Sequence, residues 1–272
     1  LAVGIILGPS VLDMLHWAPF TDKHLADAIA HIAELGVLLL MFIAGLELHL
    51  SDLAKSGKVS ALAGTLGVFL PLGMGYGLAR AFSFDDQSAL FIGLVLAATS
   101  VSISAQTLME MKVLRTRVGI GLLGAAVFDD ILVVLGLSIF VALAVGSGGF
   151  WGIVWIALRM FLYMGIAAAV GMALFPKLSR KIDSLPISQG LMAFVLIVAF
   201  FYAWSAEVLG GMAAITGAFL AGLVFARSPL KDRIETGVST LAYSFFVPVF
   251  FVNVGLAANA KLLTGESLWL LL

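Results

Sequence analysis

The sequence contains no cysteine and few charged residues, and both shortages narrow what the protein can be. Without cysteine it has no disulfides, no thiol catalysis and no thiolate metal sites. Charged residues make up 11% of the chain, whereas soluble domains carry about 25%. With 62% hydrophobic residues and a mean hydropathy of +1.14, the chain has the composition of a polytopic membrane protein.

The histidines lie in or beside predicted loops and lack the spacing of metal ligands: His16, His24, His31 and His49. The formal net charge of −1 says nothing about partners. We expect neither a resident cofactor nor a nucleic acid partner.

Apolar runs recur along the chain, most of them close to the roughly 20 residues that a helix needs to cross a bilayer. They are Leu1–Leu12, Ile32–Leu48, Ser60–Ala79, Ser88–Met109, Val118–Leu143, Trp151–Phe175, Gly190–Ser205, Met212–Ala226 and Leu241–Leu256. The sequence begins inside such a run and ends as another starts. We expect a fragment cut from a longer membrane domain.

Basic residues in the connections set the orientation, because cytoplasmic loops carry an excess of Lys and Arg. One side holds Lys55, Lys58, Lys112, Arg115, Arg117, Lys177, Arg180, Lys181, Arg227, Lys231 and Arg233. The other side holds Lys23, Arg80 and Lys261. The first side is therefore predicted to be cytoplasmic.

Two pairs of runs resemble each other across the chain. Gly4–Ser10 is similar to Ala218–Pro229, and Leu39–Glu47 is similar to Phe250–Leu256. By the charge assignment, the two members of each pair cross in opposite directions. This pattern predicts an inverted-topology repeat. The alternative is chance, since apolar runs containing glycine are common.

Asp129 and Asp130 lie at the centre of the run Val118–Leu143, which contains no basic residue. A charge near the bilayer midplane costs roughly 2.5–3.5 kcal/mol on insertion scales, so acids there mark functional sites. The two side chains diverge by about 100° on a helix. A monovalent cation favours an ionised carboxylate and a proton replaces it, which suffices for exchange if the site alternates between the two sides. The alternative is a pair of acids that serve only the structure.

The segment Ala97–Thr107, in the preceding run, is dense in hydroxyl and amide side chains. Ser100, Ser102 and Ser104 cannot share one helix face but can share a face of an extended segment. We therefore predict a local break, which would free backbone groups beside the aspartates. The alternative is an ordinary helix with small polar residues at its packing face.

The remaining intramembrane charges receive less weight. Glu47 ends the second run beside the cytoplasmic loop, and Arg159 lies about two turns into the sixth run. Both are secondary site candidates, and each is better explained as a structural anchor.

Four motifs in order resemble the cation:proton antiporter-2 family, in particular its sodium/proton exchangers with a double-aspartate motif. They are Gly45-Leu46-Glu47, Ala98-Thr99-Ser100-Val101-Ser102, Gly124-Ala125-Ala126-Val127-Phe128-Asp129-Asp130 and the stretch Phe246–Leu256. The resemblance implies an all-α, inverted-repeat sodium/proton antiporter fold with discontinuous helices, incomplete in this chain. It also implies a homodimer in which a mobile core bundle moves against a dimerisation (panel) bundle.

Site roles and domain boundaries follow from the same resemblance. Asp130 would carry the cation or the proton, with Asp129 as its partner and Thr99, Ser100 and Ser102 beside them. Residues 1–57 and 188–265 would form the panel bundle, 58–145 half of the core, 146–187 a linker helix and loop, and 266–272 the start of another helix.

The predicted function is secondary active transport at the inner (plasma) membrane, with no enzymatic activity. Na⁺, with Li⁺ or K⁺ as further substrates, would exchange for H⁺ in pH homeostasis. Potassium-efflux relatives tend to show Gln-Asp where this chain has Asp129-Asp130, which favours sodium. The alternatives are a K⁺/H⁺ efflux antiporter of the same family and a non-transporting, ion-sensing membrane protein.

Overall fold

The computed structural model describes residues 1–14, 17, 23–48, 50–99, 101–145 and 150–258, and within them the regular structure is entirely helical. The helices are α1 (Ala2–Leu7), α2 (Lys23–Glu47), α3 (Leu50–Ala81), α4 (Asp86–Ala97), α5 (Val101–Glu110), α6 (Arg117–Val145), α7 (Phe150–Asp183), α8 (Gly190–Ser205), α9 (Ala214–Phe225), α10 (Lys231–Leu241) and α11 (Val247–Ala257). One π-helical turn, η2 (Ala206–Gly210), continues α8. A second, η3 (Ala242–Phe246), joins α10 to α11. The chain divides into two compact units, one of residues 1–40 with 236–272 and one of residues 41–235.

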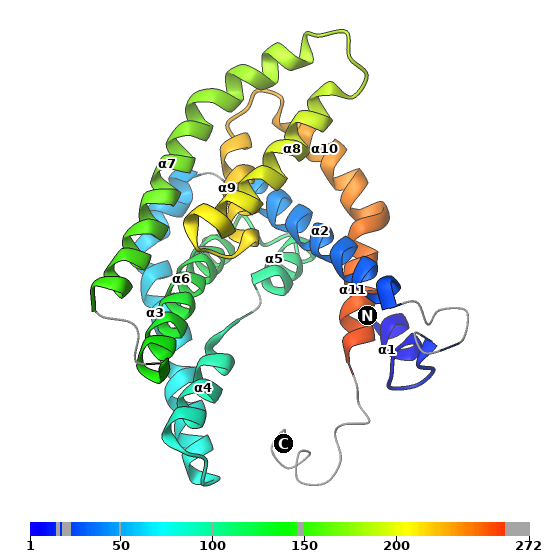
Figure 1. Ribbon diagram of the computed structural model, residues 1–272. Coiled ribbons are helices and arrows are strands. Elements are labelled where there is room, and N and C mark those ends of the chain that lie inside the picture. Colours follow the sequence, from blue (N-terminus) through cyan, green and yellow to red (C-terminus); the bar gives the residue numbers. More distant parts are fainter. Residues whose placement is uncertain (15–16, 18–22, 49, 100, 146–149, 259–272) are drawn as a thin grey trace. The chain divides into compact units, whose positions relative to one another are not determined.

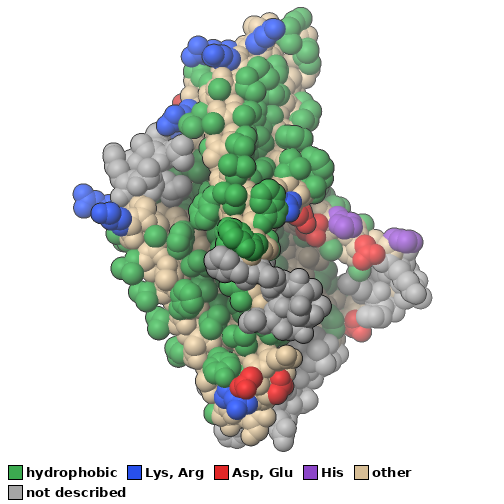
Figure 2. Space-filling model, turned by 60° about the vertical axis from the view of Figure 1, so that its left-hand side comes forward, with side chains coloured by type: hydrophobic (Ala, Val, Ile, Leu, Met, Phe, Trp, Pro, Cys, Tyr) green, Lys and Arg blue, Asp and Glu red, His purple; other side chains and the backbone are tan. Residues whose placement is uncertain are grey.

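In the part of the chain that the structure describes, six helical stretches are long and apolar enough to cross a membrane: His24–Glu47, Ser56–Ala81, Arg117–Leu137, Val154–Asp183, Gly190–Gly210 and Lys231–Ala257. Helices α4 and α9 are apolar but shorter. Hydrophobic side chains cover much of the face seen in Figure 2. Helix α7, for example, exposes the large side chains of Trp155, Phe161 and Ile166. Such a surface suits lipid rather than water. The predicted all-α, multi-pass membrane architecture is confirmed.

The run Ser88–Met109 is broken, as the sequence predicted. Helix α4 ends at Ala97, Ala98 and Thr99 have no helical structure, and α5 begins at Val101 (Figure 1). The predicted extended segment is nevertheless too long, because Ser102 and Ser104 lie inside α5. Because α5 already begins at Val101, fewer backbone groups lack hydrogen bonds in an apolar environment than in the longer extended segment.

Within the unit of residues 41–235, the end of α2 crosses α9 at two glycines. A Cβ atom on Gly45 would collide with the carbonyl oxygen of Phe219, and one on Gly222 would collide with that of Phe42. The rings of Phe42 and Phe225 meet edge to face beside the crossing, with centroids 5.9 Å apart. Backbones that approach this closely are typical of helix packing in membranes.

Within the other unit, α1 crosses α11 in the same way. A Cβ on Gly4 would collide with the carbonyl oxygen of Val252, and one on Gly255 with that of Leu1. Under the predicted repeat, the first run corresponds to the run that contains α9, and the second to the run that contains α11. The two glycine crossings are then equivalent, as an inverted repeat requires.

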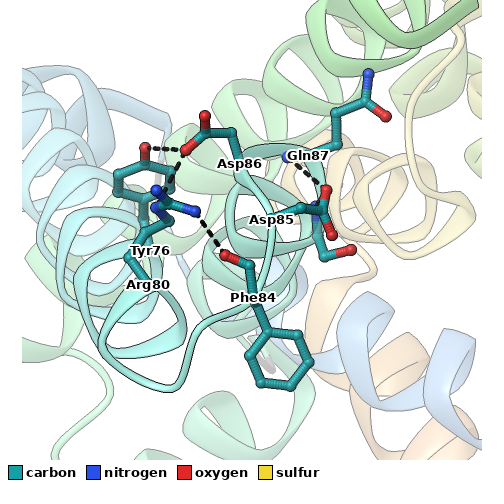
Figure 3. A network of polar contacts seen from close by, with 7 residues as sticks. Tyr76, Arg80, Phe84, Asp85, Asp86 and Gln87 are labelled. Carbon is teal, nitrogen blue, oxygen red and sulfur yellow. Dashed lines mark hydrogen bonds and ion pairs between the residues drawn. The ribbon is translucent and has the colours of Figure 1, made fainter.

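The α3–α4 hairpin is closed by polar contacts (Figure 3). Tyr76 Oη donates to Asp86 Oδ1 at 3.0 Å, and Arg80 pairs with Asp86 at 3.1 Å while donating to the carbonyl of Phe84 at 2.7 Å. Asp85 caps α4 by accepting from the amides of Gln87 and Ser88, both at 3.1 Å. The Asp85 bonds supply acceptors for backbone amides at the start of α4, and together these contacts define where the chain turns.

The glycine crossing predicts a position-specific response to alanine. We expect Gly222→Ala to destabilise the protein by about 1–3 kcal/mol, because the added methyl forces the α2 and α9 backbones apart. Gly77→Ala is the matched control: a Cβ there meets nothing within 4 Å, and alanine favours the helix. Thermal unfolding in detergent compares the two. Equal midpoints would contradict the close crossing.

The α4 cap predicts a pH-dependent contribution to stability. Hydrogen bonds from the side chain and amide of Ser88 hold the pKa of Asp85 below its ordinary value of 3.8. A carboxylate with a lowered pKa stabilises the fold at neutral pH, and this contribution is lost as pH falls through the lowered value. We expect Asp85→Ala to lower the thermal midpoint at pH 7, and Asp85→Ser, which keeps a capping oxygen, to lower it less. A midpoint unchanged by Asp85→Ala would show that the cap is dispensable.

Candidate functional site

Helix α6 carries both candidate carboxylates without interruption. Its sequence is apolar on all sides, which is typical of a helix enclosed by protein or lipid. Thr116 caps its start by accepting a hydrogen bond from the Gly119 amide at 3.2 Å. Asp129 and Asp130 lie near the middle of this helix, so their side chains leave it toward different neighbours.

Asp129 is directed at the break between α4 and α5. Its side chain is buried, with 7% of its surface exposed. Thr99, in the non-helical residues between the two helices, donates its hydroxyl to Asp129 Oδ2 at 2.7 Å. The residues between the two helices therefore supply a hydrogen-bond donor to a buried carboxylate.

Asp130 has a different partner. The hydroxyl of Thr216 donates to Asp130 Oδ2 at 2.8 Å. Thr216 lies in the first turn of α9 and is itself buried, with 6% exposed. Sequence reasoning missed this residue, although it is the one polar side chain in the apolar run Met212–Ala226.

Neither carboxylate forms an ion pair with a basic side chain in the part of the chain that the structure describes. Among the described side chains, each accepts from one hydroxyl, fewer donors than a carboxylate can accept. The described residues also contain no group of three His, Asp or Glu side chains that could hold a metal ion. Two carboxylates with hydroxyl neighbours suit a proton or a small monovalent cation that prefers oxygen ligands.

The other predicted site residues fall into two groups. Ser100 and the side chain of Ser102 lie outside the described residues. Glu47 ends α2, and its interactions are electrostatic ones with Glu235, Arg115 and Lys231. No described contact joins Glu47 to the aspartates, which leaves Thr99 as the predicted neighbour that the structure does bring to them.

Arg159 lies on α7 and binds the π-helical turn that precedes α9. Its Nε donates to the carbonyl of Leu209 at 2.5 Å, and its Nη2 donates to the carbonyl of Val208. These carbonyls lie at the end of a helical stretch, where no further turn supplies donors. Arg159 thus anchors the chain just before Gly211, which turns it with a φ of +67° toward α9.

An apolar cluster lies next to Asp130 in sequence and packs the same elements together. Ile131 of α6, Met160 of α7 and Met212 of the turn before α9 are all buried against one another. Beside them Tyr163 shares a hydrogen bond with Ser205 at 2.7 Å. The start of α9, and with it Thr216, is therefore held by packing and by the Arg159 contacts.

Comparison with known proteins gives a consistent result. The family model of the sodium/hydrogen exchanger, transmembrane, matches residues 1–272. The chain is 34% identical to the probable Na⁺/H⁺ antiporter GerT of Bacillus cereus over 100% of this chain and 69% of that protein. It is 35% identical to the Na⁺/H⁺-K⁺ antiporter GerN of Bacillus cereus, over 100% of this chain and 67% of that protein. An Na⁺/H⁺ antiporter of Enterococcus hirae is 32% identical, over 100% of this chain and 69% of that protein.

A solved structure agrees on the fold. The sodium proton antiporter MjNhaP1 of Methanocaldococcus jannaschii superposes with a TM-score of 0.63 and 17% identity, covering 96% of this chain and 64% of that one. The chain thus spans about two thirds of the length of GerT, GerN and MjNhaP1. The resemblance inferred from the four motifs is confirmed: this chain belongs to the sodium/hydrogen exchanger family.

Proposed function

We propose that the protein exchanges Na⁺ for H⁺ across the membrane and that Asp130 binds the two in turn. The observation that carries the proposal is the environment of Asp130: mid-helix, in an apolar span, with a hydroxyl donor and no basic partner among the described residues. Two relatives are named Na⁺/H⁺ antiporters, which supports the choice of ions.

Exchange follows from the chemistry of one carboxylate. An ionised Asp130 at membrane depth is costly unless a cation neutralises it. A proton neutralises it equally well, and the two cannot occupy the same oxygen together. If the loaded site opens to the two sides alternately, this carboxylate takes a cation across in one direction and a proton in the other. No resident cofactor is needed for this cycle.

The other site residues have supporting roles in the proposal. Asp129 adds negative charge beside Asp130, and the Thr99 hydroxyl keeps that charge hydrogen-bonded. Ser100 and Ser102 follow Thr99 in the broken segment.

Glu47 and Arg159 are anchors outside the ion pathway. Alternating access by a core bundle within a homodimer, with the domain boundaries predicted from sequence, belongs to the same proposal.

Potassium is the second candidate cation. GerN, which is 35% identical, is named an Na⁺/H⁺-K⁺ antiporter. A carboxylate with hydroxyl neighbours provides oxygen ligands that accept either ion, so the discrimination depends on cavity size and ligand number. Testing Na⁺, Li⁺ and K⁺ in turn decides which is carried.

If Asp130 carries the transported ions, removing its charge should abolish exchange. In proteoliposomes of the full-length protein containing a pH dye, Na⁺ should drive proton movement that Asp130→Asn reduces to the level of empty liposomes. Asp27→Asn makes the same chemical change on the surface of α2 and should leave the rate unchanged. Exchange that persists in Asp130→Asn would remove Asp130 from the transport cycle.

The Thr99 hydroxyl is predicted to support cation binding. Thr99→Val removes the donor to the buried carboxylate of Asp129, which disfavours its ionised form and weakens cation binding. We expect the apparent KM for Na⁺ to rise about tenfold, the equivalent of one hydrogen bond to a charged group. Thr99→Ser keeps the hydroxyl and is the matched control. Equal KM values for Val and Ser would show that the hydroxyl has no part in cation binding.

A further inference from the structure

The helices of residues 41–235 pack in two groups that meet at the candidate site. Helix α6 packs against α3, α4 and α5, whereas α9 packs against α8, α7 and the η2 turn. Helix α7 packs against both groups: its contact with α6 is as extensive as that of α5, and Ile131 of α6 lies against Met160 of α7 within it. The hydrogen bond from Thr216 to Asp130 is a polar link between α6 of the first group and α9 of the second.

The hydroxyl of Thr216 is directed differently from that of most intrahelical threonines in this protein. Thr65, Thr107 and Thr240 each donate to the carbonyl four residues earlier in their own helix. That local bond is the common use of a threonine hydroxyl in a helix. Thr216 lies in the first turn of α9, where its own helix offers no carbonyl four residues earlier, and it donates to a carboxylate 86 residues away in the sequence. Its hydroxyl serves the tertiary structure.

The second group holds Thr216 firmly. A Cβ on the adjacent Gly217 would collide with the carbonyl oxygen of Tyr202, so α9 and α8 are in backbone contact there. Arg159 anchors the turn that leads into α9. Since the neighbouring backbone is fixed, a movement of α6 relative to α9 must break the bond between Thr216 and Asp130.

We propose that Thr216 is a positioning residue that keeps the unoccupied site from crossing the membrane, and so couples cation movement to proton movement. This inference rests on the proposed function. In the empty site Asp130 is ionised, and its hydrogen bond to the Thr216 hydroxyl joins the two helix groups. When a cation or a proton occupies Asp130, the link weakens and the loaded site is free to move.

The difference between the two states follows from charge. A hydrogen bond to an ionised carboxylate is roughly twice as strong as one between neutral groups. A proton on Asp130 removes the charge, and a bound cation occupies the same oxygens and offsets it. The empty site is therefore the state that Thr216 holds best. An exchanger needs this property, because an empty site that crosses freely allows net leakage of one ion.

The experiment measures two rates for each variant in proteoliposomes of the full-length protein. Na⁺/Na⁺ counterflow with an isotope requires only the loaded site to cross. Net Na⁺ efflux into Na⁺-free medium requires the site to return without Na⁺, either protonated or empty. It is measured over a series of rising pH, with strong buffer and a protonophore to dissipate the proton gradient. The protonated return falls as pH rises, so the efflux that persists at the highest pH comes from the empty site. The ratio of net efflux to counterflow reports movement of the empty site. A merely structural defect lowers both rates and leaves this ratio unchanged.

We expect Thr216→Val, which removes the hydroxyl at nearly constant volume, to raise the ratio about tenfold, as for the loss of one hydrogen bond to a charged group. Thr216→Ser should keep the wild-type ratio. Thr65→Val is the matched control, because it deletes a membrane hydroxyl that bonds only within its own helix. If Thr216→Val does not assemble, Thr216→Ala removes the same hydroxyl and should raise the ratio likewise.

The outcomes separate the inference from the proposed function. A ratio unchanged in Thr216→Val or Thr216→Ala, whether or not the KM for Na⁺ changes, overturns the coupling role. A raised ratio in Thr65→Val also overturns it, since the effect would then not be specific to the link. The proposed function fails on a different result: folded wild type that shows neither Na⁺ counterflow nor cation-driven proton movement.

Discussion

The structure depends on how two carboxylates are accommodated inside an apolar helix. Asp129 and Asp130 follow each other in α6, so one helix face cannot serve both. Each receives a hydroxyl from a different element, Thr99 from the α4–α5 break and Thr216 from the start of α9. A hydroxyl donor is a weak form of compensation compared with an opposite charge. It leaves both carboxylates without an opposite charge among the described residues, which the proposed exchange of a proton for a cation requires.

Close backbone contact is the second requirement, and glycine provides it. Gly45 and Gly222 allow the end of α2 to cross α9, and Gly4 and Gly255 allow α1 to cross α11. In lipid, helices gain little from the hydrophobic effect and associate through tight packing instead. The crossing at Gly222 also places α9 against α2, so the helix that carries Thr216 is held over much of its length.

Much of the fold could be predicted from the residues in order. The span pattern, the break beside Thr99 and the position of the aspartates near mid-helix all depend on local hydropathy and side-chain type, which are visible in sequence. The length of the break could not be read correctly. The alternation of Ser100, Ser102 and Ser104 indicated an extended stretch, whereas α5 already includes Ser102 and Ser104. Backbone hydrogen bonding in an apolar environment outweighed that side-chain pattern.

The sequence alone determined the membrane class and the family, and it placed two acids inside one apolar run, because composition and motifs are properties of the chain itself. Only the tertiary structure decided which side chains meet them. Thr216 lies 86 residues from Asp130, and Arg159 lies 50 residues from the Leu209 carbonyl that it binds. A lone hydroxyl or a lone base in an apolar run has many possible partners. Helix packing selects one of them, since it brings distant turns of the chain within hydrogen-bonding distance.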